Sequence, residues 1–303
     1  MGRSLDIPHE WDAVIEMCTA CLYCIGQRQA TANEFMLDIL YGIATDPGQR
    51  ARNEDATSIF VPRSRREAQA RGWMFALADG AGGHSSGEVA ASRAVSVIAK
   101  GFEEAEEQTS LTSLLPRLIQ HANAAVYDEA LNPQWRHKGM ASTIVSCAIR
   151  QDQAVVSHVG DSRCYLIRDG RAELLTRDHI WVEEQLRQGL ISAAEAEISD
   201  SRHVRTRALG VAKFITAENT TVPVRAKDTL LLCSDGLYGK LGSDRLARLL
   251  NGRSEAPSVA AQELVREAVR LDGSDNATAL VILIRSVEAM AMYRGRQYVR
   301  PAS

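Results

Sequence analysis

The sequence has no long apolar run, no marked excess of charge of one sign and no internal repeat. No stretch approaches the roughly 18–20 consecutive apolar residues that a membrane-spanning helix needs. The 35 basic and 38 acidic side chains leave a net charge of only −3, so nothing indicates a nucleic-acid-binding or membrane-binding surface. We therefore expect neither nucleic acid nor a membrane among the partners of this protein.

The first residues also lack the features of targeting signals. The segment Met1–Asp12 contains charges and a proline but no apolar core, so we expect no secretory leader. Position 6 is Asp, whereas a myristoylation signal after Gly2 requires Ser or Thr there. We therefore expect a cytoplasmic protein. Its hydrophobic content of 45% suffices for a buried core.

Six cysteines occur, and they form two groups. Three lie in apolar, strand-like segments and are expected to be buried thiols. These are Cys147, Cys164 and Cys233. Cys18, Cys21 and Cys24 are spaced like the ligands of a metal or cluster, but no fourth ligand lies nearby. We favour the alternative, in which they occupy one side of a helix in an N-terminal extension, residues 1–36.

Hydrophobic periodicity predicts strands, then two helices, then strands, then helices and a final strand. The predicted strands are 37–43, 56–61, 73–78, 142–149, 154–159, 164–167, 229–233 and 278–284. The predicted helices are 91–102, 111–125, 181–188, 243–250 and 258–271. This order lacks the strict β-α-β alternation of a doubly wound parallel sheet. We predict an α+β fold in which helices cover antiparallel sheets.

Three connecting segments carry predictions of their own. The Arg-rich segment 61–73 is interpreted as a solvated loop between strands, in preference to a surface for an acidic partner. Ser192 and Glu195 have the spacing of a helix capping box. The tail from Ala289 has no clear partner, and we expect it to be poorly ordered.

Aspartates stand at the ends of several predicted strands. Asp79, Asp161 and Asp235 follow apolar strands, and Asp275 precedes the last strand. A single Asp-Gly pair is typical of a turn, but several carboxylates that converge repel one another unless a cation lies among them. Ligand sets made of oxygen alone favour Mg²⁺ or Mn²⁺ over Zn²⁺. We therefore predict a shared metal site that includes Asp55, Asp79, Asp235 and Asp275.

Together these segments resemble the motifs of the metal-dependent type 2C protein serine/threonine phosphatases, and more those of the bacterial branch. The resemblance runs from about residue 39 to residue 284, in the order of the family. The segments that carry it are Arg50…Asp55, Asp79-Gly-Ala-Gly-Gly-His84…Glu88, Gly139–Thr143, His158–Arg163, Asp178-His179, Thr206–Gly210, Cys233–Leu237 and Asp275-Asn276. The resemblance implies two packed antiparallel sheets flanked by helix pairs, a four-layer α-β-β-α sandwich. This domain would span residues 37–286, with a flap at about 181–203 and a tail at 287–303.

The resemblance also implies a centre of two Mn²⁺ or Mg²⁺ ions, with a third ion weakly bound. Asp79 would bridge the two ions. The other implied ligands are the Gly80 carbonyl at one ion, Asp235 and Asp275 at the first, Asp55 at the second and Asp161 at the third. Arg50, five residues before Asp55, matches the arginine with which the family clamps phosphate.

The implied activity is hydrolysis of phosphoserine and phosphothreonine in proteins by direct attack of a metal-activated water. The substrates would be phosphoproteins made by a cognate serine/threonine kinase in signal transduction. The alternative is a catalytically weak pseudophosphatase that binds a phosphoprotein or a kinase. Loss of Asp79, Asp235 or Asp275 would favour that alternative, and none is lost.

Four positions need separate interpretation. Position 81 is Ala, where animal members carry His and many bacterial members carry Met, so the leaving-group acid is unassigned. His84 is a candidate proton donor, but we favour a role at the start of the next helix. His179 is interpreted as a structural hydrogen-bonding residue. Arg163 is interpreted as a support that pairs with the acidic cluster.

Overall fold

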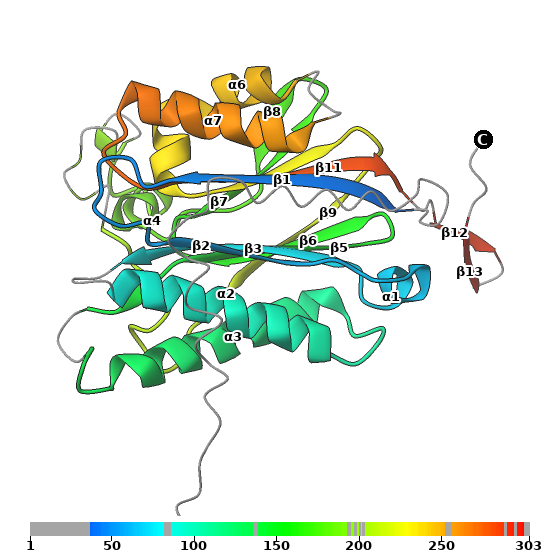
Figure 1. Cartoon of the computed structure of the whole chain (residues 1–303), viewed down its shortest axis with the longest axis horizontal. Coiled ribbons are helices and arrows are strands. Elements are labelled where there is room, and N and C mark those ends of the chain that lie inside the picture. The colour runs from blue at the N-terminus through cyan, green and yellow to red at the C-terminus, as the bar shows by residue number, and fades with distance from the viewer. Residues whose placement is uncertain are drawn as a thin grey trace, which may run out of the picture. The chain divides into compact units, whose positions relative to one another are not determined.

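Two antiparallel sheets pack against each other, and helices cover the outer face of each (Figure 1). The computed structural model describes residues 37–81, 86–135, 139–192, 195–196, 199, 201, 204–251, 256–287, 290–293 and 296–299. The predicted four-layer sandwich is confirmed. The N-terminal extension with its Cys-x-x-Cys-x-x-Cys run lies outside the described residues, so the prediction of a helix there stays a prediction.

The first sheet has the strand order β1-β11-β10-β7-β8. Its strands are β1 (Asp38–Asp46), β7 (Arg163–Arg168), β8 (Arg171–Leu174), β10 (Thr229–Cys233) and β11 (Ala277–Ser286). Helices α6 (Asp235–Leu250) and α7 (Pro257–Leu271) lie on its outer face. Gly242, with φ of 66°, interrupts α6, and the predicted helix 243–250 is only the part that follows this kink.

The second sheet has the order β2-β3-β5-β6-β9, and β4 also pairs with β3. Its strands are β2 (Asp55–Phe60), β3 (Trp73–Ala81), β4 (Ala141–Ser142), β5 (Ile144–Arg150), β6 (Gln153–Val159) and β9 (Glu218–Pro223). Helices α2 (Ser86–Glu104) and α3 (Leu111–Ala130) cover its outer face. β9 was not predicted because its sequence, ENTTVP, is polar and its residues are only half-buried or exposed.

An apolar core fills the space between the two sheets. Phe75 and Val145 reach it from one sheet, and Leu232 and Ile282 reach it from the other. Strands that are covered on both faces read as continuous apolar runs, which is why most of them were predicted. The three cysteines expected in strands are buried free thiols, as predicted.

The prediction of a plain loop over residues 61–73 is wrong. Helix α1 (Arg65–Ala70) forms there, and the Ser64 hydroxyl caps it by accepting a hydrogen bond from the Glu67 N–H. Arg63 pairs with Glu103, so this segment finds an acidic partner within its own chain.

The flap segment contains α4 (Trp181–Arg187). The predicted capping box is confirmed, because the Ser192 N–H donates to Glu195 Oε2 at 2.8 Å and the Glu195 N–H donates to Ser192 Oγ at 3.3 Å. Within the tail, β12 (Met290–Tyr293) and β13 (Arg296–Val299) pair with each other, a pairing that was not predicted. None of the helices that the structure describes combines the length and the apolar character that crossing a bilayer requires.

A prediction about stability follows from the close approach of β1 to α7. A Cβ atom at Gly42 would lie 2.2 Å from the backbone nitrogen of Ser258, so Gly42→Ala forces the helix and strand apart. We expect the free energy of unfolding to fall by about 1–3 kcal/mol, as in overpacked cores. Gly239→Ala is the matched control, because nothing lies within 4 Å of a Cβ at that exposed helical position. Equal melting temperatures for the two variants would contradict the packing of β1 on α7.

Candidate metal centre

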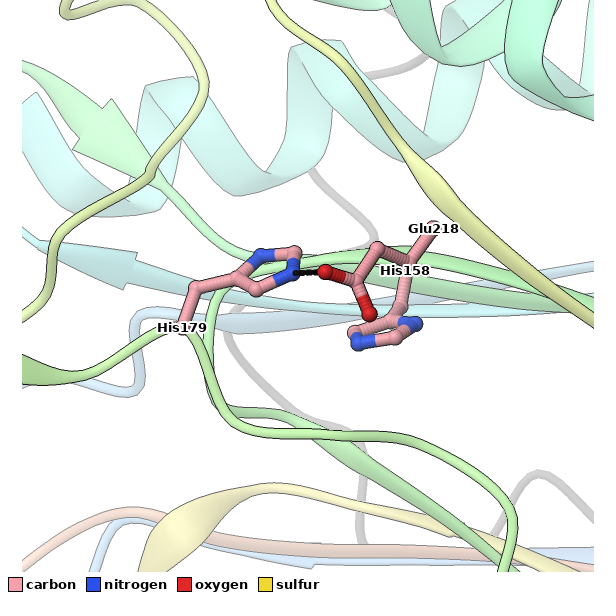
Figure 2. Close-up of side chains that lie close together, drawn as sticks. All are labelled: His158, His179 and Glu218. Atoms are coloured by element: carbon pink, nitrogen blue, oxygen red, sulfur yellow. Dashed lines mark ion pairs between the residues drawn. The ribbon is translucent and has the colours of Figure 1, made fainter. Parts of the chain in front are cut away.

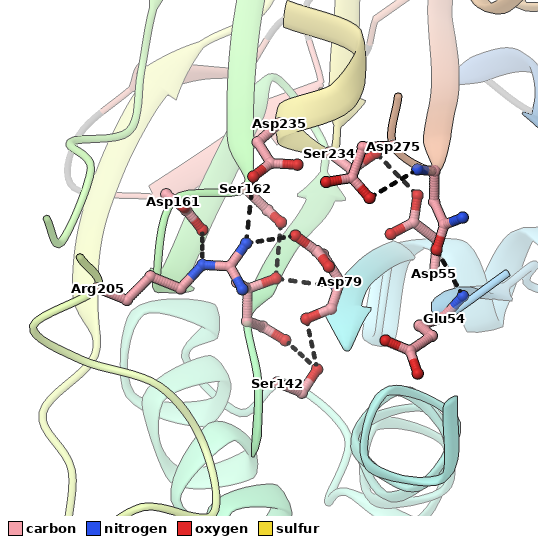
Figure 3. A network of polar contacts seen from close by, with 12 residues as sticks. Glu54, Asp55, Asp79, Ser142, Asp161, Ser162, Arg205, Ser234, Asp235 and Asp275 are labelled. Atoms are coloured by element: carbon pink, nitrogen blue, oxygen red, sulfur yellow. Dashed lines mark hydrogen bonds and ion pairs between the residues drawn. The ribbon is translucent and has the colours of Figure 1, made fainter. Parts of the chain in front are cut away.

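Five of the predicted site aspartates lie together where the strands of both sheets end (Figure 3). They come from five separate segments of the fold. Asp55 begins β2, Asp79 lies near the end of β3, Asp161 lies between β6 and β7, Asp235 begins α6, and Asp275 lies just before β11. The structure thus brings together the carboxylates that the sequence analysis selected.

Asp79 is held at its place by the loop before β5. Its backbone N–H donates to Thr143 Oγ1 at 2.9 Å, and its carbonyl accepts from the Thr143 N–H at 2.8 Å. The Ser142 hydroxyl donates to the same carbonyl at 3.2 Å. Asp55 lies directly opposite Asp79 in the β2–β3 ladder. These bonds explain why the Gly139–Thr143 motif accompanies Asp79, although Thr143 lies 64 residues after it in the chain.

Asn276 ties the loop before β2 to the start of β11. Its Oδ1 accepts from the Glu54 N–H at 2.8 Å, and its Nδ2 donates to the carbonyls of Pro47 and Arg52 at 3.0 and 2.9 Å. This loop also carries Arg50. The Asp-Asn pair at 275–276 therefore supplies one carboxylate to the cluster and fixes the loop beside it.

Asp55 shows the clearest need for a cation. Its Oδ2 accepts hydrogen bonds from Ser234 Oγ at 2.8 Å and from Thr278 Oγ1 at 2.6 Å. Its Oδ1 is buried and has no hydrogen-bond partner within the described part of the chain. Burial raises the pKa of Asp55 to about 7, although the two hydroxyls oppose the shift. A buried carboxylate oxygen without a donor fits a metal ligand.

Burial and neighbouring charges also raise the pKa values of two other carboxylates in the cluster. Burial and the charge of Asp235 raise the pKa of Asp79 well above its usual value. Burial and the charge of Asp161 raise the pKa of Asp235 to about 6. The side chains of the cluster offer carboxylate oxygens as metal ligands, and such a set fits hard divalent cations such as Mg²⁺ or Mn²⁺.

Arg205 lies inside the cluster, and the sequence analysis gave it no role. Its Nη2 donates to Asp79 Oδ2 at 2.6 Å and to Asp235 Oδ2 at 3.3 Å, and its Nε donates to Asp161 Oδ1 at 2.7 Å (Figure 3). The only local signal was its place one residue before the Thr206–Gly210 motif. Nothing in that position indicates a partner so distant in sequence.

Arg50 and Gly80 lie at the edge of the cluster. Arg50 donates from Nη2 to Asp275 Oδ2 at 2.9 Å and from Nε to the Ser274 carbonyl at 3.1 Å. Its side chain is 58% exposed, so it lies at the rim where an incoming ligand can reach it. Gly80 follows Asp79, and its N–H donates to the Glu54 carbonyl at 3.0 Å.

The predicted pairing of Arg163 with the acidic cluster is wrong. Arg163 binds Asp178 with two nitrogens, Nε to Oδ1 at 2.9 Å and Nη2 to Oδ2 at 2.7 Å. Its guanidinium carbon also lies 3.7 Å from the centre of the Tyr238 ring. The fork of an arginine is satisfied by one such bidentate carboxylate, so Arg163 supports the fold beside the site.

His179 has the structural role that the sequence analysis favoured (Figure 2). Its Nδ1 accepts from the Gly160 N–H at 3.1 Å, and its Nε2 lies 3.2 Å from Glu218 Oε1. With His158, these side chains place their ligand atoms within 4.8 Å of one another. However, the Arg207 Nη1 atom lies 3.4 Å from both His179 Nε2 and Glu218 Oε1, and a cation there disfavours a metal. Burial, His158 and Arg207 lower the pKa of His179 to about 4, so it is neutral near pH 7.

Comparison with known families settles which group of proteins shares this arrangement. A family model described as protein phosphatase 2C matches residues 49–270, most of the chain. The chain belongs to the protein phosphatase 2C family. This membership agrees with the resemblance found in the sequence and with the two-sheet fold.

Similar members of the protein phosphatase 2C family come from bacteria. The serine/threonine phosphatase stp of Listeria innocua is 33% identical over 261 residues, which cover 83% of this chain and 96% of the relative. The solved structure of Stp1 from Staphylococcus aureus has a TM-score of 0.73 and 29% identity, covering 82% of this chain and 95% of Stp1. The catalytic domain of the phosphatase PstP, solved in complex with 2 manganese ions, has a TM-score of 0.68 and 30% identity, covering 82% and 99%.

A pH-dependent prediction follows from Asp55 in this protein phosphatase 2C. Folding raises the pKa of the Asp55 carboxyl to about 7, so the ionised carboxyl lowers the free energy of unfolding of the metal-free protein. This loss of stability is complete above pH 7 and decreases as the pH falls from about 7 toward 4. In EDTA at pH 8, Asp55→Asn should therefore be more stable than the wild type by on the order of 2 kcal/mol. The difference in melting temperature should shrink at pH 5.

The control repeats the melts with excess Mn²⁺. We expect the order then to reverse, because the variant lacks the carboxylate oxygen of Asp55 that fits a metal ligand. A difference between the two proteins in EDTA that does not change from pH 8 to pH 5 would contradict the raised pKa of Asp55.

Proposed function

We propose that this chain is a metal-dependent phosphatase that hydrolyses phosphoserine and phosphothreonine in proteins. The observation that carries the proposal is the convergence of five aspartates on one point, with an unpartnered buried oxygen on Asp55 among the described residues. The serine/threonine phosphatases among its bacterial relatives support this activity. The phosphatase domain is proposed to span residues 37–286, with the flap at 181–203, the N-terminal extension at 1–36 and the tail at 287–303.

The proposed cofactors are two Mn²⁺ or Mg²⁺ ions, with a third weakly bound at Asp161. The proposed ligands of the pair are the side chains of Asp55, Asp79, Asp235 and Asp275 and the carbonyl of Gly80. The PstP structure with 2 manganese ions supports a two-ion centre in this fold. When bound, two such ions supply an acidified water as the nucleophile and neutralise charge on the phosphoryl oxygens.

The side chains of this protein hold and orient the reactants. Arg50 is proposed to bind two phosphate oxygens with its guanidinium fork, which its exposed place beside Asp275 allows. Asp79 would hold both ions, and its backbone hydrogen bonds to Thr143 would fix the carboxylate for that task. Ala81 supplies no proton to the leaving serine or threonine oxygen, and His84 lies outside the described residues, so its proposed role at the start of a helix stays a prediction.

The proposed substrates are phosphoproteins made by a cognate serine/threonine kinase in the cytoplasm. A pseudophosphatase that only binds phosphoproteins is the weaker reading. Loss of a carboxylate from the cluster would favour it, and Asp79, Asp235 and Asp275 are all present. Nothing in the comparisons favours such a binding role.

Hydrolysis of a phosphothreonine peptide tests the proposal directly. The wild type should be active with Mn²⁺ and inactive in EDTA, and Asp79→Asn and Asp235→Asn should each lower kcat by about 100-fold or more. Asp244→Asn is the control, because Asp244 is exposed on the same helix as Asp235. Near-wild-type turnover by a folded Asp79→Asn variant would refute the two-metal assignment.

Arg50 should act mainly through binding of the phosphate. We expect Arg50→Ala to raise KM about tenfold with a smaller change in kcat, because the lost hydrogen bonds are made to the phosphate of the bound substrate. Arg50→Lys keeps the charge but not the fork, so its KM should lie between the two. Steady-state kinetics on the same peptide measure both constants. An unchanged KM in Arg50→Ala would show that Arg50 does not contact the phosphate.

A further inference from the structure

Arg205 occupies the middle of the proposed metal centre. Its guanidinium contacts Asp79 at 2.6 Å, Asp161 at 2.7 Å and Asp235 at 3.3 Å (Figure 3). Only 20% of its side chain is exposed. The single positive charge therefore lies among three carboxylates that also have reason to bind divalent ions.

The backbone on both sides of Arg205 is firmly held, so this placement belongs to the fold. Ile180 and Arg205 form an antiparallel bridge, and the Trp181 N–H donates to the Val204 carbonyl at 2.8 Å. The Thr206 N–H donates to the His179 carbonyl, also at 2.8 Å. The three ion pairs of Arg205, by contrast, are all made by its guanidinium, so they do not take part in these backbone hydrogen bonds.

The guanidinium and a divalent ion compete for the same oxygens. Asp79 Oδ2 and Asp235 Oδ2 both accept from the Nη2 atom of Arg205, and both residues are proposed metal ligands. An ion bound to them would stand a few ångströms from a like charge in a poorly solvated site, where repulsion is strong. Bound metal and the present position of Arg205 therefore exclude each other.

We propose that Arg205 is an internal counter-ion of the metal centre, which divalent ions must displace from Asp79 and Asp235 in order to bind. Arg205 stabilises the metal-free protein by neutralising part of the aspartate charge. It lowers the apparent affinity for metal by the same linkage, because binding includes the loss of its ion pairs with Asp79 and Asp235. The inference rests on the proposed function, since it takes these aspartates as metal ligands.

The test is titration calorimetry of the metal-free full chain with Mn²⁺, together with melting in EDTA. Arg205→Met removes the charge and keeps an unbranched side chain. It should bind Mn²⁺ about tenfold more tightly than the wild type and should melt at a lower temperature in EDTA. Arg205→Lys keeps the charge without the fork, so its Kd should lie between those two.

Arg207→Met is the matched control. Arg207 lies two residues further along the same loop and contacts Glu218 and His179 in place of the aspartates. The variant loses the same positive charge. It therefore separates competition between the guanidinium and Mn²⁺ for the aspartate oxygens from the general effect of removing a positive charge nearby. Its Kd for Mn²⁺ should stay within about twofold of the wild-type value.

An Mn²⁺ affinity of Arg205→Met equal to or weaker than that of the wild type would overturn the inference while leaving the metal centre intact. Absence of Mn²⁺ binding by every variant and by the wild type would overturn the proposed function and this inference together. Phenylglyoxal modification of the wild type, measured by peptide mass spectrometry, needs no variant. It therefore tests the inference even where Arg205→Met does not fold. Modification of Arg205 should increase on addition of Mn²⁺, and an unchanged extent would refute displacement.

Discussion

Mutual repulsion among carboxylates held away from water is the constraint on which the structure of this site depends. Asp55, Asp79 and Asp235 all have raised pKa values because burial and like charges disfavour their ionised forms. Such a group stays together only if the rest of the fold holds it there, or if a cation neutralises it. The apolar core between the sheets and the covering helices provide the first of these conditions.

The polar residues around the cluster position the strand ends that carry the aspartates. The side chains of Thr143 and Asn276 accept hydrogen bonds from the backbone N–H groups of Asp79 and Glu54, and these bonds hold the strand ends beside the cluster. Three arginines near the cluster have different positions and partners. Arg205 lies within the cluster, Arg50 at its rim and Arg163 against a separate aspartate. The cluster therefore contains one buried cation, Arg205, which pairs with three of its carboxylates, and it has a second cation, Arg50, at its exposed rim beside Asp275.

Local patterns predicted the parts of the fold that depend on local chemistry. The apolar runs at 73–78 and 229–233 became β3 and β10 because strands buried on both faces need apolar residues throughout. The Ser192–Glu195 capping box involves residues three apart, and it is present as predicted. In contrast, β9 is polar and half-exposed, and its pairing with β6 comes from tertiary contact. The β12–β13 pair was missed because its short strands carry no strong periodic signal.

The sequence by itself determined the family, the two-sheet fold and the set of aspartates, because acidic residues at strand ends and glycine-rich turns form recognisable motifs along the chain. Only the tertiary structure decided which arginine meets them. Arg163 stands two residues after Asp161 yet binds Asp178, whereas Arg205 reaches Asp79 across 126 positions of sequence. A long flexible arginine side chain pairs with the carboxylate that the folded backbone brings within its reach. The packing of the two sheets decides which carboxylate that is.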